Sequence, residues 1–93
     1  MFFDVIDARH EGDHRIRLFF RDGKSGIVDL GNYIGEGEIY SDIRDTREFA
    51  KFCIEFGTIT WKNGEIDIAP ETLYEKATGE KIELTPETAY KAV

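Results

Sequence analysis

The sequence predicts an α+β fold: an antiparallel β-sheet of about five to six short strands, arranged as hairpins or meanders, followed by a short helix. Apolar and polar residues alternate over residues 15–20 and again over 50–61, which is typical of half-buried strands. Asp-Gly and Asn-Gly pairs follow these two runs and favour tight turns between antiparallel strands. Pro70 then marks the start of the helix.

The first 30 residues predict three strands. Residues 3–10 are rich in Phe, Val and Ile and predict a strand, and Glu-Gly-Asp over residues 11–13 predicts a turn. The alternating run over 15–20 is the second strand. A loop over 21–23 returns the chain to a third strand over 26–30.

The loop length decides which residues of the second and third strands face each other. A two-residue loop would place Asp29 on the apolar face, where its carboxylate has no evident partner. A three-residue loop with Gly23 in a left-handed bulge avoids this, so we favour it. It aligns Ile16 with Val28 and sets Arg15 opposite Asp29.

The segment that follows carries weaker signals. Residues 31–38 contain three glycines and two glutamates, which predict a flexible acidic loop; the glutamates oppose phosphate binding. One short helical turn is expected across residues 43–50. Its candidate N-terminal signals are Ser41, Thr46 and the spacing of Asp45 to Glu48.

The clearest pattern predicts a three-stranded meander over residues 50–68. Asn63-Gly64 is a preferred pair for a two-residue hairpin turn. Closing this turn places every apolar residue of the meander on one face, because the turn and the alternation then agree. The predicted pairs are Trp61 with Ile66, Thr60 with Asp67, and Ile59 with Ile68.

The last part of the chain predicts a helix and an extension. The helix starts at Pro70 and ends near Gly79. Residues 1–78 therefore form a single domain, and residues 79–93 form a C-terminal extension with a short strand and a second helix. The side chains of the first helix expected to face the sheet are Leu73 and Ala77.

Composition excludes several classes of protein. The 93 residues hold 19 acids against 12 Lys and Arg, so the net charge of −7 opposes direct nucleic-acid binding by this chain. Cys53 is the only cysteine, which excludes an intramolecular disulfide. The sequence contains neither a signal-peptide pattern nor an apolar run of membrane-spanning length. We therefore expect a cytoplasmic protein.

Four segments of the sequence are distinctive: Ile43-Arg44-Asp45, Phe49, Gly57-Thr58-Ile59-Thr60-Trp61-Lys62-Asn63-Gly64 and Asp67-Ile68-Ala69-Pro70-Glu71-Thr72-Leu73-Tyr74. Through these segments the sequence resembles a small bacterial family, domain-of-unknown-function family 2442, over roughly residues 5 to 75. Lys62 stands where many members have proline, and the loop over 31–38 looks longer and more acidic than usual.

The resemblance implies a binding role and no assigned catalytic residue. Some members resemble this domain joined to a helix-turn-helix, and others lie beside a second small protein, as in toxin–antitoxin pairs. The leading expectation is a protein–protein interaction module, an accessory or antitoxin-like partner in a two-gene system. An alternative is a homodimeric structural or regulatory domain related to the N-terminal domains of transcription factors.

A third alternative is a small metal-dependent enzyme. His10 and His14 flank a turn and could meet at a hairpin mouth with Glu11 or Asp13, although a structural zinc site needs four ligands. Cys53 has no histidine nearby in sequence to activate it. We expect neither catalysis nor a cofactor.

The expected interaction surface combines polar and aromatic residues. Residues 1–30 hold six acids and five bases, so the remaining residues carry a charge of −6 and are expected to attract a basic partner. Arginines at positions 15, 17 and 21 predict a small basic stripe on one strand face. The residues proposed for this surface are Trp61, Asn63, Asp67, Glu71, Tyr74, Arg15 and Arg17.

Overall fold

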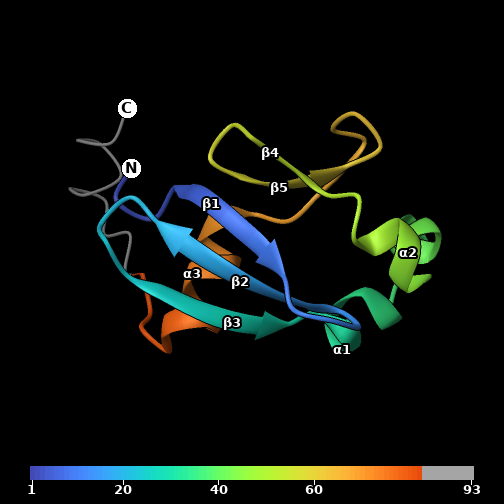
Figure 1. Ribbon diagram of the computed structural model, residues 1–93, viewed down its shortest axis with the longest axis horizontal. Helices are drawn as coiled ribbons and strands as arrows, with labels where there is room; N and C mark the ends of the chain where they lie inside the picture. Colours follow the sequence, from blue (N-terminus) through green and yellow to red (C-terminus); the bar gives the residue numbers. More distant parts are fainter. Residues whose placement is uncertain (83–93) are drawn as a thin grey trace.

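The computed structural model describes residues 1–82 and confirms the α+β fold (Figure 1). Six antiparallel strands form two three-stranded sheets, and a helix follows the last strand. The sheet orders are β1-β2-β3 and β4-β5-β6. In chain order the elements are β1 (Val5–His10), β2 (Arg15–Phe20), β3 (Ser25–Asp29), α1 (Gly31–Gly35), the 3₁₀-helix η1 (Glu38–Ile43), α2 (Thr46–Phe49), β4 (Cys53–Glu55), β5 (Thr58–Trp61), β6 (Ile66–Asp67) and α3 (Pro70–Thr78).

The first sheet has the predicted register. Ile16 lies opposite Val28 and Arg15 opposite Asp29. Gly23 has φ = +91°, the left-handed conformation that the three-residue loop requires. The β2 strand is therefore the centre of its sheet, with β1 and β3 as its edges.

Residues 31–38 are partly helical, so the prediction of a flexible loop is wrong. Leu30 and Ile34 are both fully buried, and this i, i+4 pair holds α1 against the core. The Asp29 carboxylate accepts a hydrogen bond from the Gly31 N–H (2.9 Å). The three glycines of this segment favoured a loop prediction over the helical spacing of Leu30 and Ile34. Asp45, rather than Ser41 or Thr46, supplies the side-chain cap of α2.

The second sheet confirms the predicted meander and corrects its burial. Thr60 pairs with Asp67 and Trp61 with Ile66, as the Asn-Gly turn predicts. The predicted pair of Ile59 with Ile68 is not formed, because β6 ends at Asp67, and the first strand of the meander begins at Cys53 and not at residue 50. All four residues of β5 are buried, so this strand is not half-buried. Ile54 and Phe56 are exposed instead, and the expectation that every apolar residue of the meander lies on one buried face is wrong.

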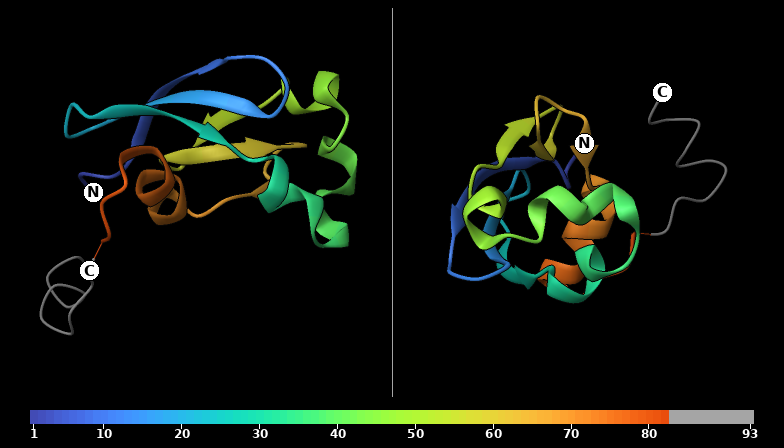
Figure 2. Two further views of the ribbon diagram at one scale, coloured as in Figure 1. Left: turned by 90° about the horizontal axis from the view of Figure 1, so that it is seen from below. Right: turned by 90° about the vertical axis from the view of Figure 1, so that its right-hand side faces the viewer.

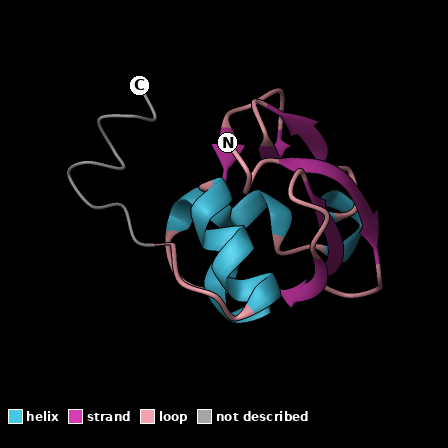
Figure 3. Ribbon diagram, turned by 90° about the vertical axis from the view of Figure 1, so that its left-hand side faces the viewer, coloured by secondary structure: helices cyan, strands magenta, loops and turns pink. Residues whose placement is uncertain are grey.

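Helix α3 packs against β3 and β5, as two further views show (Figure 2). Gly26 permits this approach, since a Cβ atom at this position would lie 2.2 Å from the Ala77 carbonyl oxygen. Leu73 is fully buried and Ala77 is partly buried, which confirms the predicted inner face of the helix. Most helical turns lie beside the strands, and a further helical segment lies behind them (Figure 3).

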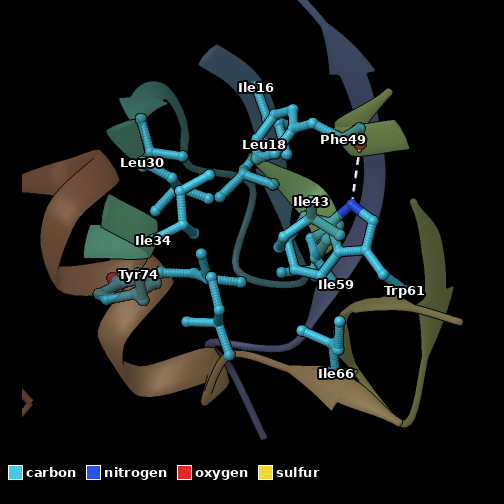
Figure 4. Close-up of a cluster of buried hydrophobic side chains, with 14 of the residues drawn as sticks. Ile16, Leu18, Leu30, Ile34, Ile43, Phe49, Ile59, Trp61, Ile66 and Tyr74 are labelled. Carbon is cyan, nitrogen blue, oxygen red and sulfur yellow. Dashed lines mark hydrogen bonds between the residues drawn. The ribbon is translucent and has the colours of Figure 1, made fainter. Parts of the chain in front are cut away.

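One hydrophobic core joins the two sheets and the helices (Figure 4). A single backbone hydrogen bond, from the Val5 N–H to the Gly57 carbonyl (2.9 Å), connects β1 to the β4–β5 turn among the described residues. Side-chain packing therefore joins the sheets. The labelled core residues are Ile16, Leu18, Leu30, Ile34, Ile43, Phe49, Ile59, Trp61, Ile66 and Tyr74.

The predicted boundary at residue 78 coincides with the end of α3. Gly79 closes the helix with φ = +76°. Glu80 then binds Lys24 of the β2–β3 loop. The second helix predicted near the C-terminus lies outside the described residues 1–82.

Candidate protein-interaction surface

Tyr33 and Tyr40 form an aromatic pair between α1 and η1. Their ring centroids are 5.5 Å apart with an interplanar angle of 51°, and both side chains are half-buried. The pKa of Tyr40 is raised to about 12. The largest cause is contact with the Tyr33 side chain, followed by burial and by the negative charges of Tyr33 and Asp67. Asp67, at the end of β6, therefore acts on the same surface.

Arg44 holds the connection between α1 and η1. Its Nε donates to the Ile34 carbonyl (2.8 Å) and its Nη2 to the Gly37 carbonyl (2.6 Å). The guanidinium is thereby bound to backbone oxygens. This contact fixes the bend that presents Glu36 and Glu38, on either side of Gly37, to solvent.

Four exposed carboxylates belong to the same part of the fold as the tyrosine pair: three lie within three residues of Tyr33 or Tyr40 in the chain, and the charge of the fourth, Asp67, acts on Tyr40. Glu36, Glu38, Asp42 and Asp67 are exposed, and none forms an ion pair with another residue in the described part of the chain. A lysine already contacts one ring: Lys76 Nζ lies 5.5 Å from the centroid of Tyr33. We call this set the tyrosine–acid surface, defined as Tyr33, Glu36, Glu38, Tyr40, Asp42 and Asp67.

Two residues predicted for the interaction surface are core residues. Trp61 and Tyr74 are each only 2% exposed. The Trp61 indole donates to the Phe49 carbonyl (2.8 Å), and the Tyr74 hydroxyl donates to the Asp22 carboxylate (2.7 Å). Buried aromatic residues with one polar atom need such a partner, so these contacts account for both residues within the domain.

Asn63 lies beside a small open cavity of about 300 Å³. Lys51 and Lys62 each place Nζ 3.1 Å from a Glu48 oxygen. These two ammonium groups lower the pKa of Glu48. Two ammonium groups share one carboxylate, so this group of side chains keeps a net charge of +1 beside the cavity. Its lining is Glu48, Lys51, Cys53, Trp61, Lys62 and Asn63.

The predicted basic stripe is balanced by acids. Arg15 lies 3.5 Å from Asp13, and Arg17 lies 3.1 Å from Glu11. Arg21, in the loop after β2, lies 3.5 Å from Asp4. The three arginines therefore do not form a strongly positive surface.

The two histidines contact Phe49 and backbone oxygens. His10 Nε2 lies 2.9 Å from the Asp13 carbonyl oxygen, and His14 Nε2 lies 2.7 Å from the Arg44 carbonyl oxygen. Their rings lie 5.9 and 5.0 Å from that of Phe49. Within residues 1–82, no three or more His, Cys, Asp or Glu side chains are grouped so as to hold a metal ion.

Three edge strands carry features that oppose pairing with another chain. A bulge interrupts β1 between Val5 and Asp7, and the Asp7 carboxylate accepts the Ala8 N–H (2.9 Å). The β4 strand has three residues and β6 has two. Short, bulged or charged edges resist strand addition, so these three edges offer little to a second copy.

Comparison with family models identifies the sequence family of the chain. Residues 5–79 match the family described as "Protein of unknown function (DUF2442)". The chain belongs to this family. No curated protein and no solved structure matches it. In this DUF2442 chain, no helix within residues 1–82 has the length and apolarity needed to cross a membrane.

The segments on which the resemblance rests build the hydrophobic core more than the molecular surface. The Asn-Gly turn sets the register of β5 and β6. The position of α3 is set by three buried side chains, those of Ile68, Leu73 and Tyr74. Glu71 lies in the first turn of α3 and is half-buried, whereas Asp67 belongs to the tyrosine–acid surface. Sequence reasoning missed Tyr33 and Tyr40, because their pairing depends on the fold of residues 31–43.

Proposed function

We propose that this DUF2442 chain is a protein-interaction module that binds a basic segment of a partner protein at the tyrosine–acid surface. One observation supports this most directly: the exposed carboxylates of Glu36, Glu38 and Asp42, within three residues of Tyr33 or Tyr40 in the chain, and that of Asp67, whose charge acts on Tyr40, have no cationic partner among residues 1–82. Unpaired acids beside aromatic faces favour lysine and arginine side chains.

Lys76 illustrates the chemistry of this recognition within the chain. Its ammonium group lies over the Tyr33 ring, and cations are attracted to the negative face of an aromatic ring. An incoming lysine or arginine would use the neighbouring ring and carboxylates. The net charge of −7 would also accelerate the approach of a basic partner at low salt.

The cellular role that we propose is that of an accessory or antitoxin-like component of a two-gene system in the cytoplasm. The supports are the acidic charge and the resemblance to members that lie beside a second small protein. Binding, and not catalysis, would be its activity. The partner proposed is the product of the adjacent gene, with a basic segment at the contact.

Co-purification with the adjacent gene product at low and high salt tests the proposal. We expect retention at low salt, loss at high salt, and loss in Glu38→Lys. Glu65→Lys is the matched control, because it makes the same charge change at an exposed turn outside the tyrosine–acid surface. Equal retention by wild type and Glu38→Lys at both salt concentrations would overturn the proposed surface.

A further inference from the structure

The outer edge of β3 lacks the features that protect the bulged β1 edge and the short β4 and β6 edges. Its five residues, Ser25–Asp29, pair with β2 in one unbroken register. The strand contains no proline, and its only charged residue is Asp29, at its end. It forms the lower border of the first sheet in Figure 1. A regular edge of this kind is a template for pairing with another strand.

Alternate backbone groups of β3 point away from the sheet. The Phe20 N–H donates to the Lys24 carbonyl, and the Leu30 N–H donates to the His14 carbonyl. Bonds between directly opposite residues alternate along an antiparallel pair, so the even-numbered residues of β3 bond to β2. The N–H and C=O groups of the odd-numbered residues therefore point to the outer edge; these residues are Ser25, Ile27 and Asp29.

Helix α3 packs on one face of β3. A Cβ atom on Gly26 would lie 2.2 Å from the Ala77 carbonyl oxygen, so α3 lies on the side to which positions 26 and 28 point. The three odd-numbered residues project to the opposite face, where all three are exposed. Within residues 1–82, no backbone group outside the first sheet bonds to their N–H or C=O groups. The described part of the chain thus leaves the hydrogen-bonding groups of this edge without partners.

A second copy of β3 complements this edge. An antiparallel β3–β3 pair with its two-fold axis at Ile27 sets Ile27 against Ile27 of the second copy, and Ser25 against Asp29. Each of these pairs exchanges backbone hydrogen bonds, because the same residues face the edge in both copies. Ile27 is 45% exposed and gains an apolar contact, and the Ser25 hydroxyl can donate to the Asp29 carboxylate. None of these pairs sets like charges opposite each other.

The edge residues favour this register over its neighbours. A shift by one residue would set odd-numbered residues against even-numbered ones, whose backbone groups already bond to β2. A shift by two residues in one direction would set Ile27 against Asp29. A shift by two in the other direction would set Ile27 against Ser25. Both lose the apolar contact at the two-fold axis, so only the register centred on Ile27 pairs all three edge residues well.

We propose that two copies of the chain dimerise through their β3 edges, which joins the two β1-β2-β3 sheets into one continuous antiparallel sheet. The proposal goes beyond the basic partner of the tyrosine–acid surface and does not rest on it. The edge is short and each copy carries a net charge of −7, so we expect a weak dimer. Salt should strengthen it by screening this repulsion, whereas salt weakens the binding of a basic partner.

Sedimentation of the full chain tests the proposal. We expect the apparent mass to rise from monomer toward dimer between about 10 µM and about 1 mM. Ile27→Lys sets two ammonium groups face to face at the two-fold axis, so it should weaken the dimer at least about tenfold. Ile6→Lys is the matched control, because it makes the same change at an isoleucine that is 54% exposed on the bulged β1 edge. It should leave the dimer unchanged, and both variants should melt near the wild-type temperature.

Substitutions of Ser25 test the register. Ser25→Lys sets a cation against the Asp29 carboxylate of the second copy and should tighten the dimer severalfold, whereas Ser25→Asp sets two carboxylates together and should weaken it. Ser41→Lys and Ser41→Asp make the same charge changes at an exposed serine outside β3 and should have much smaller effects. Amide hydrogen exchange at Ser25, Ile27 and Asp29 should slow as the protein concentration rises.

Four outcomes would overturn the proposal. The first is a monomer over the whole concentration range. The second is a dimer that Ile27→Lys and Ile6→Lys affect equally. The third is a shift in the same direction for Ser25→Lys and Ser25→Asp. The fourth is a monomer whose Ser25, Ile27 and Asp29 amides exchange slowly, because another part of the same chain would then cover the edge.

Discussion

Trp61 and Phe49 link the second sheet to α2 through one buried hydrogen bond. The indole Nε1 donates to the Phe49 carbonyl oxygen at 2.8 Å, and the two rings lie 5.4 Å apart (Figure 4). Both side chains are essentially inaccessible to solvent. The Phe49 ring also contacts His14 of the first hairpin. Phe49 is thus a point where three parts of the fold meet.

Replacing Trp61 should measure this link. We expect Trp61→Phe to lower the free energy of unfolding by about 2–4 kcal/mol, since it removes volume and leaves the Phe49 carbonyl without its donor. Urea unfolding measures the change. Incorporation of 3-benzothienylalanine at position 61 keeps the ring size and removes only the N–H. Wild-type stability in that analogue would contradict a contribution from the hydrogen bond.

Gly26 should be intolerant of any side chain. A Cβ atom there would lie 2.2 Å from the oxygen and 2.9 Å from the carbon of the Ala77 carbonyl group, so Gly26→Ala forces α3 away from β3. We expect a loss of about 1–3 kcal/mol in thermal or urea unfolding. Gly35→Ala is the matched control, because no heavy atom lies within 4 Å of the added Cβ. An equal effect of the two substitutions would refute the close approach.

The strands could be predicted from sequence because their turns are local. The conformation of Gly23 and the Asn-Gly pair fix the registers of two hairpins, and alternation then assigns each residue to a face. Burial of β5 on both faces could not be predicted in this way. It depends on packing partners such as Ile68, whose carbonyl accepts the Thr58 hydroxyl, and these partners come from a different element.

The candidate surfaces were harder to predict because they are tertiary. Tyr33 and Tyr40 meet across the α1–η1 bend, where Arg44 binds two backbone carbonyls. Trp61 was named for the interaction surface as an amphipathic aromatic, although alternation also placed it on the apolar face of the meander, and its hydrogen bond is satisfied inside the fold. Phe56 was assigned inward by alternation, although the turn directs it to solvent. Periodicity therefore failed where a turn interrupts a strand.

Asp45 should be the residue that stabilises the start of α2. Its carboxylate accepts the Arg47 N–H at 2.8 Å. Asp45→Ala should cost about 1 kcal/mol, which is typical of a lost helix cap. Ser41→Ala is the comparison, since the Ser41 side chain does not cap α2. A larger loss in urea unfolding for Ser41→Ala than for Asp45→Ala would reverse the assignment.

Acid should destabilise the fold through carboxylates with lowered pKa values. The Lys51 and Lys62 ammonium groups lower the pKa of Glu48, and the Arg47 N–H lowers that of Asp45. The stability that these two carboxylates contribute is fully present above their ordinary pKa values, 4.5 for Glu48 and 3.8 for Asp45. It is lost as the pH falls through the lowered values, because the unfolded chain then binds more protons than the folded chain.

The acid effect can be assigned to Glu48 with one pair of variants. Glu48→Gln should lower stability at neutral pH and reduce its decline on acidification, measured by urea unfolding between neutrality and acid. Glu65→Gln removes a carboxylate that forms no ion pair within the described residues, so its profile should remain close to that of wild type. A Glu48→Gln profile parallel to wild type would exclude a role for the two ion pairs.

Alkaline titration should report the geometry of the tyrosine–acid surface. Contact with Tyr33 is the largest reason that the pKa of Tyr40 is raised from 10.0 to about 12, followed by burial, and the Asp67 charge contributes least. A raised pKa in the folded state means that stability is fully present below pH 10 and is lost as pH rises toward about 12.

Tyr40→Phe should therefore flatten the alkaline decline in stability. It should also remove the ionisation near pH 12 from the absorbance titration at 295 nm. Tyr33→Phe should lower the Tyr40 midpoint, and Asp67→Asn should lower it by less. A Tyr40 midpoint unaffected by Tyr33→Phe would show that the two hydroxyls do not interact in solution.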